Sequence, residues 1–392
     1  MSTPSILVLN GGSSSIKFSL FEINGDTLEE SLHGQIEGIG APHPRLAIKE
    51  RNDARQRELG ADEAGSHDAA IAALTRAIAA RRAALDIVAV GHRVVHGGAR
   101  YTEPARMDAA ALTYLETMTP LAPLHLPYNI AVIRAVSAEL PVPQIACFDT
   151  AFHQGRDTSA QLFGLPYELY EAGVRRYGFH GLSYEYIASA LPLFAPDIAD
   201  RRVIVAHLGN GASLCAMKQR RSVETTMAFS GLDGLPMGTR TGQLDPGVIL
   251  YLLRERGATV QELENLLYKK SGLLGISGLS GDMRDLLQSD APRATWAVDY
   301  FVRRAARETA ALAVATGGLD ALVFTGGIGE HAAVIRARIC RQLGWLGLQL
   351  SESANAAGSG CISESGSPIS AWVIPSNEEL MIARHTLALL AF

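Results

Sequence analysis

The chain has 392 residues, which exceeds the size at which a single hydrophobic core stops growing, so we expect two domains. Hydrophobic residues make up 47% of the chain and charged residues 19%, a balance that excludes an extensively disordered protein. The net charge of −5 argues against a general nucleic-acid binder, because such proteins carry a basic excess.

The cysteines and the N-terminal segment bear on the cellular compartment. The four cysteines are Cys147, Cys215, Cys340 and Cys361, and no two of them form a CxxC pair. This spacing fits neither a zinc knuckle nor a disulfide framework and indicates a reducing compartment. The apolar run Ile6 to Leu9 is too short for a signal peptide or a membrane span. We therefore expect a cytoplasmic protein that makes no membrane contact.

The first quarter of the chain opens on a strand, a glycine turn and a second strand. This pattern, ILVLNGGSSSIKFSLF at residues 6–21, predicts a β-hairpin. Residues 40–65 are polar and irregular, and we expect a surface excursion there. Residues 68–85 are Ala-rich with helical spacing. The motif GHRVVHGG at residues 91–98 then places Arg93 and His96 at the end of an apolar strand.

The next segment alternates helix and strand. Residues 128–140 follow a proline and have helical spacing, and residues 142–148 read as a strand with Asp149 at its end. Asp149 alone could be a helix cap, and His180, in RRYGFHGLSY, could be an ordinary buried histidine. Two further arginines, Arg175 and Arg176, belong to the same motif.

The second half repeats the opening design about 200 residues later. VIVAHLGNGASLCAMK at residues 203–218 predicts another hairpin, and Arg240 follows in a Gly-rich loop. Residues 296–317 predict a long amphipathic helix. In residues 321–339 a strand and a glycine turn lead into helical spacing instead of a second strand. Residues 354–366 are expected to be a loop, followed by a strand at residues 369–374. The repeat indicates two related α/β halves.

Glycine turns after strands let backbone N–H groups approach an anion without interference from a Cβ. No GxxxxGK[ST] motif is present, and no GxGxxG motif stands between a strand and a helix, which argues against P-loop and Rossmann folds. Arginines flanked by apolar residues need anionic partners. Together, the charged and Gly-rich loops at strand ends indicate a cleft suited to phosphoryl transfer.

The motifs together resemble the acetate kinase family, within the superfamily of acetate and sugar kinases, heat-shock ATPases and actin. In family order from about residue 7 to 384 they are LNGGSSSIKF, GHRVVHGG, PLHLPYN, CFDTAFH, RRYGFHG, HLGNGAS, GLPMGTRTGQLDP, GISGLSGDMRD, FTGGIGE and SNEEL. The resemblance implies an α/β fold of two ribonuclease H-like (actin-like ATPase) domains with a cleft between them. Residues 1–149 with 379–392 would form the first domain, and residues 150–378 the second, nucleotide-binding domain.

The resemblance also implies the chemistry. The enzyme would transfer the γ-phosphoryl group of ATP to acetate by a direct in-line step, giving acetyl phosphate and ADP, and the reaction would be reversible. The cofactor would be Mg²⁺, with Mn²⁺ as an alternative, and the protein would be a homodimer formed through the second domain.

Residue roles carry over position by position. Asn10 and Glu378 would hold the metal, and Asp149, His180 and Arg240 would act at the reacting centre. The acyl substrate would be bound by Arg93, Val95, Leu124, His125 and Phe179. The nucleotide would contact Lys17, His207, Leu208, Gly209, Asn210, Gly211, Asp282, Met283, Arg284, Gly327, Ile328, Gly329, Glu330 and His331.

Several positions depart from the family pattern. Leu126 and Tyr128 stand in PLHLPYN where PLHNPPN is usual, and Leu182 and Tyr184 stand in YGFHGLSY where YGFHGTSH is usual. Gly231 replaces a proline expected to wall the acyl pocket. Since one methylene is worth only about 1–3 kcal/mol of discrimination, propionate is expected to serve nearly as well as acetate.

Three other interpretations remain open at this stage. A butyrate-type acyl kinase would share the reaction class. An actin-like or chaperone-like ATPase would need the phosphate turns and the adenosine loop but not Arg93. A non-catalytic relative would have lost part of the charged set, which is intact in this chain.

Overall fold

The computed structural model describes residues 3–50, 53–81 and 85–390, and the chain divides into two compact units. Unit 1 is Met1–Ala151 with Asn377–Phe392, and unit 2 is Phe152–Ser376. We predicted domain boundaries after Asp149 and before Glu379, and these boundaries stay a prediction. Among the described residues, no helix has the length and apolar character needed to cross a membrane.

Unit 1 is built on one sheet with the strand order β5-β4-β3-β2-β1-β6-β8-β7. Its strands are β1 (Thr3–Gly11), β2 (Ser15–Asn24), β3 (Thr27–Glu37), β4 (Arg45–Glu50), β5 (Asp53–Glu58), β6 (Leu85–Val94), β7 (Ala105–Arg106) and β8 (Gln144–Phe148). Strands β1 and β2 pair antiparallel, which confirms the first predicted hairpin. Strands β1, β6 and β8 run parallel, so their carboxyl ends lie at one edge of the sheet.

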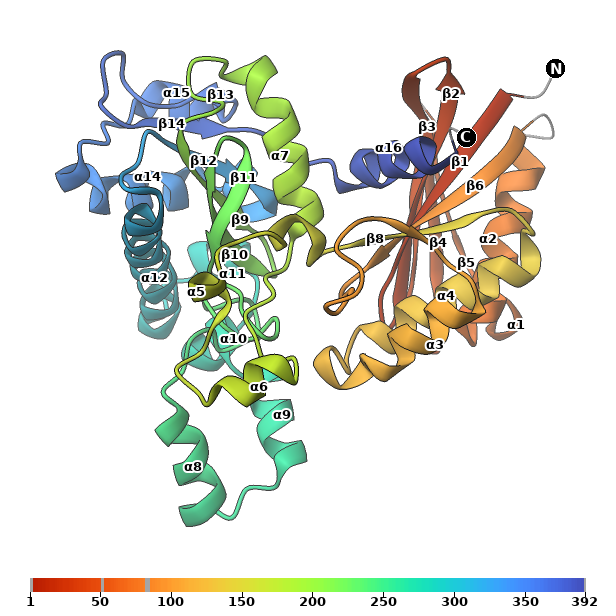
Figure 1. Cartoon of the computed structure of the whole chain (residues 1–392), viewed down its shortest axis with the longest axis horizontal. Helices are drawn as coiled ribbons and strands as arrows, with labels where there is room; N and C mark the ends of the chain where they lie inside the picture. Colours follow the sequence, from red (N-terminus) through yellow and green to blue (C-terminus); the bar gives the residue numbers. More distant parts are fainter. Residues whose placement is uncertain (1–2, 51–52, 82–84, 391–392) are drawn as a thin grey trace. The chain divides into compact units, whose positions relative to one another are not determined.

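Helices cover both faces of this sheet (Figure 1). They are α1 (Ala61–Ala64), α2 (His67–Arg81), α3 (Ala109–Thr117), α4 (Leu126–Glu139) and α16 (Glu378–Leu390). Leu7 and Leu9 of β1 share a core cluster with Ile71 of α2 and Val132 of α4. On the opposite face Gly91 of β6 lies so close to α16 that a Cβ there would collide with the helix. This alternation of side chains between the faces creates a helix–sheet–helix layering.

Unit 2 has a smaller sheet with the order β11-β10-β9-β12-β14-β13. Its strands are β9 (Arg202–Leu208), β10 (Ala212–Lys218), β11 (Arg221–Thr225), β12 (Ala321–Thr325), β13 (Gly360–Cys361) and β14 (Ser370–Val373). The hairpin β9–β10 is antiparallel, as predicted, while β9, β12 and β14 run parallel. The run β11-β10-β9-β12-β14 therefore has the same arrangement as β3-β2-β1-β6-β8, and the predicted α/β repeat is confirmed.

The helices of unit 2 pack on both faces of its sheet, with α7 and α12 on opposite sides (Figure 1). They are α5 (Thr158–Gln161), α6 (Tyr167–Glu171), α7 (Gly181–Phe194), α8 (Pro246–Glu255), α9 (Val260–Lys269), α10 (Gly272–Ser277), α11 (Met283–Leu287), α12 (Pro292–Thr316), α13 (Gly326–His331), α14 (Ala333–Gln342) and α15 (Glu352–Ala357). Tyr184 and Ile187 of α7 share a core cluster with Val205 and Val323. The glycines after β12 form the start of α13, and α14 follows, so the predicted switch to helix is confirmed.

Two predicted loops were wrong. Residues 40–65 contain β4, β5 and α1, and residues 354–366 contain the end of α15 and all of β13. Every residue of β5 is exposed, so this edge strand has no apolar alternation by which the sequence could reveal it.

Some helices begin or end at residues other than the predicted ones. Helix α4 begins at Leu126, ahead of the expected position 128, because Pro127 is tolerated in the first turn. Helix α12 begins at Pro292 for the same reason, and it ends where Gly317 adopts a φ of 74°. The helix expected over residues 68–85 is α2, which ends at Arg81; residues 82–84 lie outside the described residues, and Leu85 already belongs to β6.

Candidate active site

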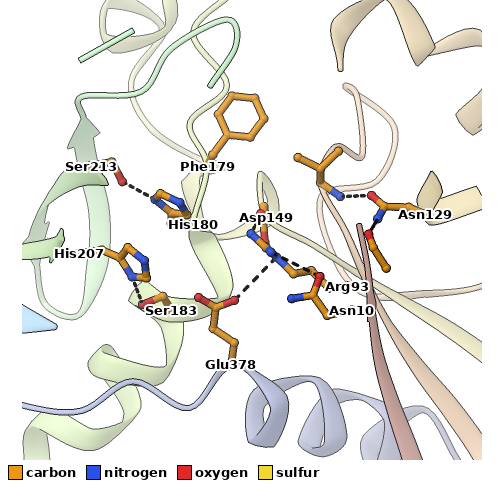
Figure 2. A network of polar contacts seen from close by, with 12 residues as sticks. Asn10, Arg93, Asn129, Asp149, Phe179, His180, Ser183, His207, Ser213 and Glu378 are labelled. Carbon is orange, nitrogen blue, oxygen red and sulfur yellow. Dashed lines mark hydrogen bonds and ion pairs between the residues drawn. The ribbon is translucent and has the colours of Figure 1, made fainter. Parts of the chain in front are cut away.

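The first glycine turn places Asn10 and Lys17 opposite each other in the β1–β2 hairpin. A hydrogen bond from α4 holds this turn in place, because the side-chain amide of Asn129 donates to the Gly11 carbonyl at 2.8 Å. The Oδ1 atom of Asn129 also accepts from the backbone N–H of Val95 at 3.0 Å, as Figure 2 shows. One buried asparagine therefore sets the spacing between the glycine turn and the end of β6.

A buried ion pair joins the ends of the neighbouring strands β6 and β8. Arg93 donates from Nε to Asp149 Oδ1 at 3.0 Å and from Nη2 to Oδ2 at 2.6 Å. The Asp149 side chain is 2% exposed, so its charge requires this bidentate partner. Burial alone lowers the pKa of Arg93, but the charges of Asp149 and Glu378 raise it above its ordinary value. The guanidinium stays charged, and N–H groups on Nη1 and Nη2 point away from the Asp149 contact.

Glu378, the first residue of α16, completes this cluster (Figure 2). One carboxylate oxygen lies 3.7 Å from Arg93 Nε, and the Asn10 amide oxygen lies 3.5 Å from Arg93 Nη1. Burial raises the pKa of Glu378 to about 7, with Asp149 adding to the rise and Arg93 opposing it. A cation would relieve this penalty. The oxygen donors of Asn10 and Glu378 are of the type that Mg²⁺ prefers, so the residues fit the implied metal.

A complete protein cage for a metal is absent from the described part of the chain. No three His, Cys, Asp or Glu side chains converge there in a way that could hold an ion. Mg²⁺ commonly takes one or two protein carboxylates and fills its other positions with water and phosphate oxygens. The donor set therefore suits a metal that arrives with a nucleotide rather than a permanently bound one.

The expected acyl-site residues lie in both units. Val95, Leu124 and His125 belong to unit 1, where Val95 packs against the core cluster that contains Phe148. His125 precedes α4 as its N-cap residue. Phe179 belongs to unit 2 and is buried.

In unit 2, two expected phosphoryl-site residues converge on Gly211. A Cβ added at Gly211 would lie 3.0 Å from Arg240 Nη2 and 3.3 Å from His180 Nε2. Arg240 is oriented by a 2.9 Å hydrogen bond from Nη1 to the Gly231 carbonyl. The absence of a side chain at Gly211 thus leaves a guanidinium and an imidazole nitrogen facing the same small space.

The two histidines of this region stack. The ring centroids of His180 and His207 are 4.3 Å apart, with an interplanar angle of 24°. Each ring is held through Nδ1 by a serine at 2.8 Å, His180 by Ser213 and His207 by Ser183 (Figure 2). His207 is also opposite Ser213 across the β9–β10 hairpin. The strand register and the start of α7 therefore aim both rings.

A cavity of about 630 Å³ opens within unit 2 beside the second and third glycine turns. Eight of the expected nucleotide residues line it: Gly209, Asn210, Asp282, Met283, Arg284, Gly327, Ile328 and His331. Its walls also include residues that sequence reasoning missed, namely Gly281, Leu287, Gln288, Ala332, Ala333 and Val334. Apolar walls with a few polar groups at the rim are typical of sites that take a nucleoside.

The other six expected nucleotide residues do not line this cavity. Lys17 lies in unit 1, and His207, Leu208 and Gly211 belong to or follow β9. Glu330 instead accepts hydrogen bonds from the backbone of Gly326 at 2.8 Å and of Ser376 at 3.3 Å. Its carboxylate braces the third turn, where Gly326 has a φ of 76° and a Cβ would meet the Leu208 carbonyl. The neighbouring Gly329 is buried within α13.

Comparison with known proteins identifies the family. Residues 5–384 match the model of the acetokinase family. The chain belongs to the acetokinase family. An acetate kinase of Rhodopseudomonas palustris is 53% identical over 386 residues, covering 97% of both chains. Among solved structures, a propionate kinase of Francisella tularensis aligns with a TM-score of 0.92 at 38% identity, covering 99% of this chain and 100% of that one. An acetate kinase of Porphyromonas gingivalis gives 0.88 at 34%, with 99% and 100% covered.

One supporting residue of this acetokinase-family chain escaped sequence reasoning although its motif was recognised. Asn129 closes PLHLPYN, but its two hydrogen bonds, to Gly11 and Val95, span long stretches of sequence. The available signal was a polar residue on the otherwise apolar buried face of α4. Such a residue needs a partner, but the sequence does not say which.

Glu378 provides a pH-dependent test of the stability of unit 1. Its pKa is raised to about 7 from an ordinary value of 4.5, so the folded state loses stability as pH rises through this window. We expect Glu378→Gln to raise the thermal midpoint by a few degrees at pH 8 and to have no such effect at pH 4. Differential scanning calorimetry at both pH values measures this.

The matched control for that experiment is Glu352→Gln. Glu352 also begins a helix, but its side chain is 65% exposed, so its replacement should leave the midpoint nearly unchanged. A lower midpoint for Glu378→Gln at pH 8 would mean that attraction to Arg93 outweighs the desolvation of the carboxylate.

Proposed function

We propose that the protein is an acetate kinase, which transfers the γ-phosphoryl group of ATP to a carboxylate oxygen of acetate. The products are acetyl phosphate and ADP, and the reaction is reversible. Membership of the acetokinase family supports this assignment. The observation that carries it is the Arg93–Asp149 pair, because it presents a fixed cation that is suited to a small carboxylate.

Arg93 is proposed to bind the acyl carboxylate. Asp149 accepts from Nε and from one N–H of Nη2, and Asn10 Oδ1 accepts from Nη1 at 3.5 Å, so the guanidinium is held in place. One N–H on each Nη atom can still donate. A carboxylate held end-on by these donors has one oxygen available to attack phosphorus. Asp149 is then a positioning residue that keeps Arg93 charged and oriented.

His180 and Arg240 are proposed to stabilise the phosphoryl group during transfer. Phosphoryl transfer depends mainly on positioning and on donors that face the equatorial oxygens, and an arginine in that role is worth about 10³–10⁵ in rate. The convergence of His180 Nε2 and Arg240 Nη2 at Gly211 supports these roles. The transfer is proposed to be direct and in line, with no covalent enzyme intermediate.

The nucleotide is proposed to bind in unit 2, with the adenosine in the 630 Å³ cavity and the phosphates along His207 to Gly211. Lys17 is assigned to the phosphates as well. Asn10 and Glu378 are proposed to hold Mg²⁺, with Mn²⁺ as an alternative, and the metal would neutralise charge on the phosphate oxygens.

The protein is further proposed to form a homodimer through unit 2 and to act in the cytoplasm. None of the residues of α8 is buried. The helix nevertheless carries several large apolar side chains that are exposed: Val248, Leu250, Tyr251 and Leu253. A second copy would cover this face. The cytoplasmic location is supported by the four free cysteines.

Replacing Arg93 with Ala should abolish acyl-phosphate formation and spare nucleotide binding. The reason is that Arg93 lies in unit 1, whereas the nucleotide cavity is built from unit 2 alone. The product is trapped as hydroxamate after incubation with ATP, Mg²⁺ and acetate, and ADP affinity is measured by calorimetry. We expect at least a thousandfold loss of kcat/KM.

The control is Arg100→Ala, since Arg100 is an exposed arginine of the same unit that stacks on Tyr101 and Tyr114. It should retain nearly full activity. If wild-type protein binds ATP but makes no acyl phosphate, the kinase assignment is wrong and a nucleotide switch becomes the better explanation.

Acyl-chain preference depends on the position occupied by Gly231. Without the proline ring that is usual at this position, the acyl pocket has room for a longer chain. The kcat/KM for propionate should therefore lie within about fivefold of that for acetate. The same hydroxamate assay with acetate, propionate and butyrate measures this. A strong preference for acetate would contradict the expectation, and Gly231→Pro should then change this preference little.

A side chain at Gly231 would approach Arg240 Nη1 at 2.8 Å, so Gly231→Pro must also be tested for turnover with acetate.

The dimer is tested by light scattering on the intact protein. Wild-type protein should have twice the chain mass, and Leu250→Glu should reduce it to the monomer, because a charge on α8 would be buried without a partner. Leu193→Glu is the control, because Leu193 is an exposed leucine elsewhere in unit 2, and this variant should remain dimeric. A monomeric wild type would overturn the proposal.

A further inference from the structure

Tyr184 of α7 is a fully buried residue whose hydroxyl belongs to a short chain of polar contacts. Its oxygen lies 2.5 Å from Ser213 Oγ, and Ser213 Oγ lies 2.8 Å from His180 Nδ1. Ser213 is fully buried as well. The contact therefore runs from the core of unit 2 to the imidazole that faces Gly211.

The direction of the hydrogen bonds in this chain follows from acidity. A phenol is a much stronger acid than an aliphatic alcohol, so Tyr184 donates to Ser213 rather than the reverse. Ser213 has a single hydrogen, and with its oxygen accepting from Tyr184 that hydrogen is directed to Nδ1 of His180. Nδ1 is then an acceptor, which places the ring proton of the neutral imidazole on Nε2.

Nε2 is the atom that must carry a proton if His180 is to act on a phosphoryl group. It lies beside Gly211 together with Arg240 Nη2. With hydrogen on Nε2 the ring donates to an anionic oxygen, whereas the other tautomer would present a lone pair and repel it. We propose that Tyr184, acting through Ser213, is a positioning residue that holds His180 in the tautomer with its proton on Nε2.

The backbone and a neighbouring ring fix the position of the His180 imidazole. His180 is the N-cap residue of α7 and adopts a φ of 58°. Its ring stacks on the ring of His207, with the two centroids 4.3 Å apart. Ser183, next to Tyr184, forms a hydrogen bond with His207 Nδ1, so residues in one turn of α7 position both rings.

Position 184 is also where this chain differs from the usual family motif, which has histidine there. A histidine at 184 would still bring an N–H donor toward Ser213, whereas phenylalanine would keep the ring and remove the donor. The pair of variants therefore separates the hydrogen bond from the packing. Tyr186→Phe on the same helix is the control, since Tyr186 is a partly buried tyrosine that packs against the same core cluster.

The inference rests on the proposed function, and the experiment has two readouts so that the two can fail separately. The first is steady-state kinetics with ATP, Mg²⁺ and acetate. Tyr184→Phe should lower kcat by about 10–100-fold, with the KM values for ATP and acetate within about twofold of wild type. Tyr184→His should recover most of kcat, and Tyr186→Phe should retain it.

The second readout is the ¹⁵N chemical shifts of the His180 ring, assigned by comparison with His180→Gln. Wild type should show the signature of a proton on Nε2, and Tyr184→Phe should show a population with the proton on Nδ1. Ser213→Ala should produce the same shift and the same kcat loss. If Tyr184→Phe is unfolded by circular dichroism, the Ser213→Ala result decides.

Unchanged kcat and ring shifts in a folded Tyr184→Phe variant would overturn the proposal. An effect confined to KM would also overturn it, because it would indicate a packing role only. If wild type makes no acyl phosphate, the proposed function fails, but the ring shifts of wild type and variant still test the tautomer assignment.

Discussion

The candidate site of unit 1 depends on the parallel order of β1, β6 and β8. Parallel neighbours end at the same edge of a sheet, so the residues that follow their apolar cores meet there. Asn10, Arg93 and Asp149 are brought together in this way from positions up to 139 residues apart in the chain (149 − 10). Asp149 is nearly inaccessible to solvent, so its pairing with Arg93 is a condition for burying the charge at all. The Arg93–Asp149 ion pair therefore both stabilises the buried charge and fixes the orientation of the guanidinium.

Unit 2 uses the same sheet arrangement for another purpose. Strands β9 and β12 are parallel and end in the second and third glycine turns, which border the cavity. In unit 1 the helix that covers the strand ends brings a carboxylate, Glu378. In unit 2 the corresponding polar groups are imidazoles and a guanidinium, each oriented by a hydroxyl or a carbonyl. The same strand arrangement thus gathers a guanidinium with carboxylate and amide oxygens in unit 1, and imidazoles with a guanidinium in unit 2.

Much of this could be predicted from local pattern. Both hairpins and the switch to helix after the third turn follow from short-range alternation and glycine placement, which is why they were predicted correctly. Strand β5 was missed because it is exposed throughout and has no apolar face. Strand β4 was missed because its alternation is limited to the two buried residues Leu46 and Ile48. The walls of the cavity beyond the motifs, such as Leu287 and Val334, were missed because ordinary apolar residues carry no mark of a binding site.

The sequence by itself determined the α/β class, the internal repeat, the order of the motifs and the residue types available for chemistry, since each of these is written in contiguous segments. Only the tertiary structure decided that Arg93 is held by Asp149, that Asn129 joins Gly11 to Val95, and that Tyr184 reaches His180 through Ser213. The physical reason is that hydrogen bonds and ion pairs depend on distance and direction in space. Strand order and register set those quantities, and a linear sequence states neither for residues that lie far apart.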